Sequence, residues 1–143
     1  MTALATGLLL IPLLDQALKL LVLRGLASTT VLLGPFGRLE VVRSRVWLVR
    51  SGLQPKLATV WSVWFVAAGS LALLSGALPS CGGFAGALLG GSLSHALETA
   101  LRGCVIDYVR LRFWPAFNLA DVAITVGALG VLTQIVIATQ AAW

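Results

Sequence analysis

The uncharged stretch LATVWSVWFVAAGSLALLSGAL, Leu57 to Leu78, decides the fold class of this chain. It is close to the roughly 20 residues that a helix needs to cross a bilayer core about 30 Å thick. Backbone polar groups in lipid must be hydrogen-bonded within the protein, and this stretch lacks the alternation of a barrel strand. The stretch therefore predicts a membrane-spanning helix.

Three further apolar runs of similar length lie at 3–23, 84–101 and 119–138. The 143 residues are 59% hydrophobic and 10% charged, and their mean hydropathy of +0.99 lies far above that of an ordinary soluble domain. We predict a single integral membrane domain over 1–143 with four transmembrane helices. A cleavable signal peptide is the alternative for the first run, but that run lacks a basic region before it and contains Asp15 and Lys19, so a retained helix is favoured.

Residues 25–56 form the main polar segment, between the first two helices. The stretches RLEVVR and RVWLVR within it are β-branched, partly alternating and bounded by glycine and proline, which is typical of short strands. The predicted fold class is a membrane all-α protein with a small extramembrane β-sheet at about 36–54, although a surface loop is the alternative there. The connector at 103–118 is rich in aromatic residues, which indicates a membrane interface.

Ten basic residues against five acidic ones give the chain a net charge of +5. Most of the basic residues fall between the predicted helices, where anionic lipid headgroups are the nearest partner, and no platform of aromatic and basic residues for nucleic acid is visible. We therefore predict membrane lipids, and no nucleic acid, as partners. Taken alone, the positive-inside rule would place these loops in the cytoplasm and both termini outside.

Ionisable residues within the predicted helices are costly and invite a functional explanation. Asp15 and Lys19 are four residues apart on one helix face, as are Glu98 and Arg102, so each pair can form an ion pair. His95 lies on the same face as Glu98. These residues either form a structural polar stripe, support a site, or line a proton or ion path.

Spacing argues against two other chemistries. His95 and Glu98 form a single His-x-x-Glu motif, whereas a metal site in a four-helix bundle needs several such contributions, so we predict no metal and no cofactor. Cys104 is more than about 10 Å along the helix from His95, too far for a nucleophile and its base. Cys81 and Cys104 flank the third helix at opposite membrane faces, so we expect no disulfide between them.

Asp107 follows the third helix and Asp121 opens the fourth, so antiparallel packing brings both to the same membrane face. Two carboxylates within hydrogen-bonding range share a proton, which is the chemistry of an aspartic protease. The alternative is that Asp121 is a helix-start carboxylate favoured by the helix dipole and Asp107 a loop residue.

The run GGSLSHALETALRGCVIDYVRLRFWPAFNLADVAITVG, residues 90–127, resembles bacterial lipoprotein signal peptidase, also called signal peptidase II. The family pattern is G-G-x-x-G-N-x-x-D-R, then a V-V-D-F-like segment, then F-N-x-A-D-x-x-I. Here Gly90-Gly91, Val105-Ile106-Asp107-Tyr108, Phe117-Asn118-Leu119-Ala120-Asp121 and Ile124 match. The helix-one stretch DQALK, residues 15–19, also resembles the family's D-Q-x-x-K.

The resemblance implies an aspartic endopeptidase that cuts the signal peptide of diacylglyceryl-modified prolipoproteins before the lipidated cysteine. Asp107 and Asp121 would be catalytic, and Asn118 would hydrogen-bond in the site. Further supporting or substrate-binding residues would be Asp15, Lys19, Gly91, His95, Glu98 and Arg102. The implied enzyme is a multi-pass monomer of the bacterial inner membrane. Its termini would be cytoplasmic and its active site near the periplasmic face, against the simple charge count, with the sheet cradling the substrate.

The chain departs from the family pattern in the third helix, where His95 stands for Asn, Glu98-Thr99 for Asp-Arg and Ser94 for Gly. The N-x-G-x-A-F motif after the first strand is absent, and Arg102 is placed to take over the role of the missing arginine. Two rival interpretations follow. One is a catalytically silent family member that binds lipidated peptides, and the other is a small four-helix scaffold or ion-path subunit.

Overall fold

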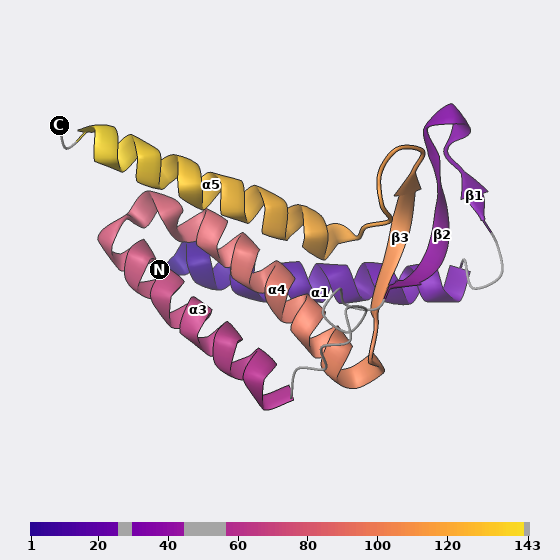
Figure 1. The fold of residues 1–143 in the computed structure, drawn as a ribbon, viewed down its shortest axis with the longest axis horizontal. Helices are drawn as coiled ribbons and strands as arrows, with labels where there is room; N and C mark the ends of the chain where they lie inside the picture. The colour runs from indigo at the N-terminus through magenta and orange to yellow at the C-terminus, as the bar shows by residue number, and fades with distance from the viewer. Residues whose placement is uncertain (26–29, 45–56, 142–143) are drawn as a thin grey trace.

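A computed structural model describes residues 1–25, 30–44 and 57–141. The helices of this part are α1 (Thr2–Gly25), α3 (Leu57–Ala77), α4 (Gly82–Arg102) and α5 (Leu119–Ala141). Each predicted apolar run is therefore helical, with ends within one turn of those expected. Figure 1 shows the helices side by side, with a small sheet standing across one end of them, next to the start of α5.

The sheet has three antiparallel strands in the order β1 (Val31–Leu32), β2 (Gly37–Ser44) and β3 (Val105–Leu111). The stretch RLEVVR lies in β2 as predicted, whereas RVWLVR, at 45–50, lies outside the described residues. Placing the whole sheet between the first two helices was wrong, because β3 follows α4. The β-branched stretch VIDYVRL becomes a strand by pairing with β2, a partner that the local sequence does not reveal.

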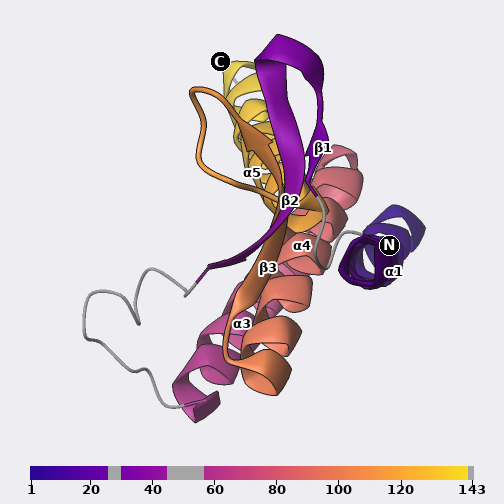
Figure 2. The same cartoon turned by 90° about the vertical axis from the view of Figure 1, so that its right-hand side faces the viewer.

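α4 is the central helix and contacts α1, α3 and α5. In the second view it lies between α1 and the start of α5 (Figure 2). Close packing depends on glycine: a Cβ added at Gly86 would lie 2.5 Å from the Leu4 carbonyl oxygen, and one at Gly90 would lie 2.5 Å from that of Gly7. Small residues spaced four apart let helix backbones approach in this way in membranes.

Three of the described helices, α1, α3 and α5, are long and apolar enough to cross a membrane, with hydropathies of 1.7, 1.8 and 2.0. Their outward faces expose large apolar side chains such as Leu13, Phe65 and Leu129. α4 is as long as α3 but carries His95, Glu98 and Arg102 among glycines and serines. Its polar side chains face the other helices and the sheet, so the bundle is most polar at its centre.

Candidate active site

Asp107 lies on β3, paired across the ladder with Val42, and is only 5% exposed. The Ser44 hydroxyl donates to Asp107 Oδ2 at 2.5 Å, and the Asn118 side-chain amide donates to Asp107 Oδ1 at 2.7 Å. Burial raises the pKa of Asp107 and the negative charge of Asp121 raises it further, while the hydrogen bonds from Ser44 and Asn118 and the nearby His95 oppose these effects. Asp107 therefore keeps its proton to a higher pH than an ordinary exposed aspartate does.

Asp121 lies in the first turn of α5, where it exchanges hydrogen bonds with Asn118. The Asn118 backbone N–H donates to Asp121 Oδ2 at 2.9 Å, and the Asp121 backbone N–H donates to Asn118 Oδ1 at 3.1 Å. This is the reciprocal pattern of a capping box, with asparagine as the cap and aspartate three residues later. The spacing N-x-x-D thus starts the helix and fixes the direction of the Asp121 carboxylate.

Asn118 joins the two carboxylates and is almost fully buried, at 1% exposure. Its amide nitrogen also donates to the Ile106 carbonyl at 3.3 Å, so it faces β3, while its carbonyl oxygen faces the Asp121 backbone N–H. These backbone partners determine which end of the amide points each way. One side chain therefore holds Asp107 by its nitrogen and the backbone of Asp121 by its oxygen.

His95 reaches the same cluster from α4. Its Nε2 lies 3.3 Å from Asn118 Oδ1 and 3.5 Å from Asp121 Oδ1. Because the Asn118 oxygen only accepts hydrogen bonds, Nε2 must carry the hydrogen. His95 thus belongs with the carboxylates, and Glu98 points into a different network. Among the described residues no group of three metal-ligating side chains occurs.

A network of four charged side chains joins α1 to α4; Asp15, Lys19 and Glu98 are fully buried in it, whereas Arg102 is partly exposed. The predicted ion pairs are both present, Lys19 with Asp15 at 2.7 Å and Arg102 with Glu98 at 2.7 Å. Lys19 also contacts Glu98 at 2.5 Å, a contact that joins the two pairs and that spacing along one helix could not predict. The two acidic and two basic side chains balance in charge, so each of the three buried charges has a partner of opposite sign.

Asp15 connects this ion network to the start of α5. Its Oδ1 accepts a hydrogen bond from the Ala120 backbone N–H at 3.1 Å, and its Oδ2 accepts one from the Ser94 hydroxyl at 2.6 Å. An acidic group at a helix N-terminus satisfies a free N–H and is favoured by the helix dipole. Asp15 therefore anchors the residue next to Asp121 without contacting the catalytic candidates.

Gly91 permits the same junction by its lack of a side chain. A Cβ there would lie 2.6 Å from the Ala120 carbonyl oxygen and 2.9 Å from Ile124 Cγ1. The structure thus brings all nine predicted site residues to the region where α1 and α4 meet β3 and the start of α5: Asp107, Asp121, Asn118 and His95 in the carboxylate cluster, Asp15, Lys19, Glu98 and Arg102 in the ion network, and Gly91 at the junction.

Sequence reasoning missed Ser44 and Tyr108. Ser44 is the last residue of β2 and reaches Asp107 only because β2 pairs with β3. The Tyr108 hydroxyl accepts the backbone N–H of Leu119 at 3.1 Å and so helps to cap α5, and burial raises the pKa of this phenol. Neither role has a signal in the local sequence, since both depend on where β3 lies.

An apolar hollow of about 190 Å³ opens beside Asp121. Its walls come from the aromatic connector and the outer face of the first turns of α5: Trp114, Phe117, Val122, Thr125 and Val126. Asp121 is 38% exposed in its side chain, whereas Asp107 is buried on the sheet side. The carboxylate cluster is thus accessible from the side of the bundle where lipid would lie.

The family model described as Signal peptidase (SPase) II matches residues 8–137, a range that includes every site residue named above. The chain belongs to the signal peptidase II family. The two aspartates, the asparagine cap and the helix-one ion pair all lie within the matched range of this signal peptidase II chain.

Similar proteins agree with this membership. The lipoprotein signal peptidase of Methylobacterium sp. (strain 4-46) is 32% identical over 144 residues, which cover 86% of this signal peptidase II chain and 82% of the relative. That of Moorella thermoacetica is 40% identical over 50 residues, so the match spans 35% of this chain and about a third, 33%, of the relative. A solved structure of a bacterial membrane enzyme shares the fold, with a TM-score of 0.78, 15% identity and coverage of 94% and 93% of the two chains.

Proposed function

We propose that this chain is an aspartic endopeptidase that removes the signal peptide from diacylglyceryl-modified prolipoproteins by cutting before the lipidated cysteine. The observation that carries the proposal is the position of the Asn118 amide between two carboxyl groups. The amide donates a hydrogen bond to the buried carboxyl of Asp107 and accepts one from the backbone of Asp121, whose carboxyl is more exposed. Membership of the signal peptidase II family supplies the substrate class.

The environments of the two carboxyl groups support different roles for them. Asp107 is buried and has a raised pKa, so it is the protonated member, which gives its proton to the oxygen of the scissile carbonyl. Asp121 is more exposed and faces His95, so it is the ionised member, which takes a proton from the attacking water.

With these roles, water and the two carboxyl groups account for every proton that moves in the reaction. Water oxygen bonds to the carbonyl carbon, its proton passes to Asp121, and the carbonyl oxygen takes the proton of Asp107, giving a tetrahedral gem-diol. As the C–N bond breaks, Asp121 passes its proton to the leaving nitrogen and Asp107 recovers a proton from the gem-diol. His95 stabilises the negative charge on Asp121 at the start of the cycle, and Asn118 keeps the two acids in register.

The membrane setting is part of the same proposal. All four helices span the bacterial inner membrane as one domain, α4 being shielded by its neighbours, and the carboxylates lie near the periplasmic face. The apolar hollow beside Asp121 admits the signal peptide from the lipid side. The sheet cradles the peptide at the surface, and the enzyme acts as a monomer.

The test uses purified protein in detergent with a synthetic diacylglyceryl prolipoprotein. We expect cleavage by the unmodified chain and a loss of at least about 10³-fold in kcat for Asp107→Asn and for Asp121→Asn, because each removes a proton carrier from the dyad. Glu40→Gln is the matched control, since it makes the same chemical change on β2 at a carboxylate that Arg38 and Arg110 bind and that takes no part in the hydrogen bonds described for Asp107 and Asp121.

Two outcomes would reject this function. Binding of the lipidated peptide without any cleavage by the unmodified chain would identify a silent family member instead. Unimpaired cleavage by either aspartate variant would refute the dyad. The ion network disfavours an ion path, because Asp15, Lys19, Glu98 and Arg102 are all paired with one another.

A further inference from the structure

The end of the sheet farthest from the carboxylates holds a second cavity, of about 350 Å³. Its walls come from the turn that precedes β2 and from the end of β3, including Pro35, Arg38, Arg110 and Arg112. At about 3.3 Å per residue, Arg110 lies about 10 Å along the strand from Asp107. The cavity is therefore separate from the proposed peptidase site.

Positive charge dominates this cavity. Arg38 and Arg110 each lie 2.8 Å from one oxygen of Glu40, which holds the two guanidinium groups together and whose pKa is lowered mainly by the hydrogen bond from Arg110. Arg112 has no acidic partner within the described ranges of the chain. Three arginines against one glutamate leave a net of two positive charges, which an anion with two or more oxygens complements.

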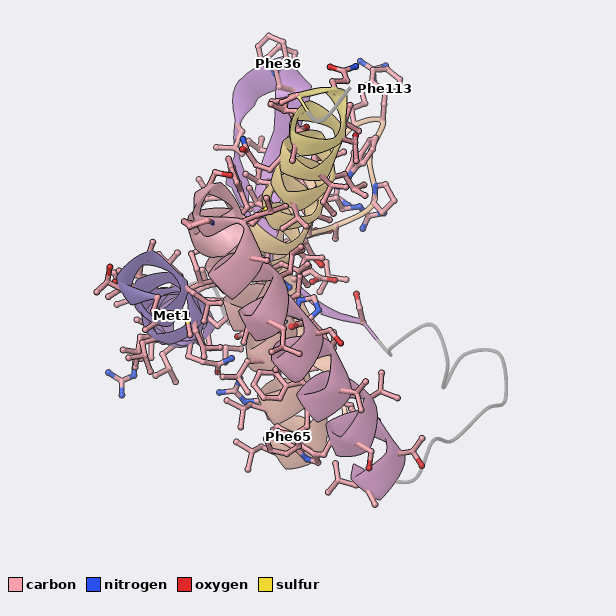
Figure 3. The ribbon with its side chains drawn as sticks, turned by 90° about the vertical axis from the view of Figure 1, so that its left-hand side faces the viewer. Met1, Phe36, Phe65 and Phe113 are labelled. Carbon is pink, nitrogen blue, oxygen red and sulfur yellow. The ribbon has the colours of Figure 1, made fainter. Side chains whose placement is uncertain are left out.

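Exposed aromatic residues surround the same end of the sheet. Phe36 is 75% exposed, and Phe113, beside the Arg112 guanidinium, is 89% exposed. Figure 3 shows Phe36 and Phe113 at the same end of the view as the β1–β2 hairpin. Aromatic side chains beside cationic ones are typical of protein surfaces at the level of lipid headgroups.

The sheet is placed where such a surface meets lipid. It stands across the ends of the helices, and the β1–β2 hairpin extends past the start of α5, beyond the outline of the bundle at that end (Figures 1 and 2). In a membrane this tip overhangs lipid rather than protein. An anionic headgroup in the leaflet on that side is then the nearest source of a phosphate.

We propose that the cavity formed by Arg38, Arg110 and Arg112 binds the phosphate of an anionic phospholipid headgroup, with Phe36 and Phe113 in contact with the adjoining glycerol and acyl region. The lipid would hold the sheet at a fixed depth at the surface. The inference depends on the membrane placement of the bundle and is independent of peptide cleavage.

Binding is measured by native mass spectrometry of the full chain in detergent, without any peptide, using short-chain phosphatidylglycerol and phosphatidylcholine of equal acyl length. We expect phosphatidylglycerol to bind at least about tenfold more tightly, with an affinity that falls as salt rises. Arg112→Gln should weaken phosphatidylglycerol binding by about tenfold, because it removes the guanidinium that has no competing acid among the described residues.

The matched control is Arg43→Gln, which removes an exposed arginine from β2 outside the cavity and should leave the affinity unchanged. Equal binding of the two lipids, or equal losses in the Arg112 and Arg43 variants, would overturn the site. Competition by inorganic phosphate at the same concentration as the lipid would overturn the lipid as occupant. Unfolding temperatures of the lipid-free variants identify any loss caused by misfolding.

Discussion

The side chain of Asn118 has two structural roles. Its oxygen caps α5 and its nitrogen holds the buried carboxyl of β3, so the start of the helix and the spacing of the two acids depend on the same amide. A helix cap is worth about 0.5–2 kcal/mol, whereas a preorganised hydrogen bond at a reacting group is worth about 10²–10³ in kcat. The two roles can therefore be measured apart.

We expect Asn118→Ala to lose both the cap and the bridge, lowering the unfolding free energy by about 1 kcal/mol and kcat by about 10²-fold. Asn118→Ser is the informative companion, because serine caps helices well but is too short to reach Asp107. It should recover most of the stability and little of the activity. Equal recovery of both in detergent assays would mean that the bridge has no catalytic role.

The raised pKa of Asp107 has a consequence for stability. The folded chain binds this proton more tightly than the unfolded chain does. Asp107 therefore begins to lower the free energy of unfolding as the pH rises above its pKa in the unfolded chain. The full loss is present once the pH exceeds its pKa in the folded chain. Asp107→Asn, which cannot ionise and can keep the bonds to Ser44 and Asn118, should therefore raise the unfolding temperature at pH 8. At pH 3 the gain should vanish. A lower unfolding temperature at pH 8 would contradict the sign.

His95 lowers the pKa of Asp107, although less than burial raises it. His95→Asn removes an imidazole that can carry charge, so the pKa of Asp107 should rise further. If Asp107 must be protonated for cleavage, the alkaline limb of kcat/KM against pH should move to higher pH in this variant. A purely structural role for His95 would lower the rate and leave that limb in place.

At the scale of elements, the helices were predictable and the sheet was only partly so. An uncharged run such as 57–78 satisfies its own backbone hydrogen bonds, so its length and composition suffice. β3 depends on a partner distant in sequence, and the contact of Ser44 with Asp107 follows from that pairing. The Lys19–Glu98 contact was missed for a similar reason, because it depends on how α1 and α4 face each other.

The junction of α4 with α5 depends on a missing side chain. Gly91→Ala would push a methyl group against Ala120 and Ile124, and overpacking of this kind costs about 1–3 kcal/mol. Because Ala120 adjoins Asp121, we expect a fall in both the unfolding temperature and kcat. Gly83→Ala is the matched control in the same helix, since nothing lies within 4 Å of its added Cβ, and it should leave both unchanged or raise stability slightly.

Across the whole molecule, the ion network joins α1 to α4 and, through Asp15, to α5. Lys19→Met would leave Asp15 and Glu98 buried with fewer partners, which typically costs about 3–5 kcal/mol. The double variant Lys19→Met with Glu98→Gln neutralises one of the two carboxylates that lose their lysine partner, so it should be more stable than the single variant. Chemical unfolding in detergent measures this, and a double variant less stable than the single one would show that the network contributes packing rather than charge balance.

The two acids come from elements on either side of the aromatic connector, and the second is supplied by the last helix of the described chain. A nascent chain that has reached only β3 carries Asp107 without Asp121 and without the Asn118 cap. Whatever chemistry the pair performs is therefore absent until α5 has been synthesised and packs against α4. The order of synthesis therefore delays the assembly of the two acids.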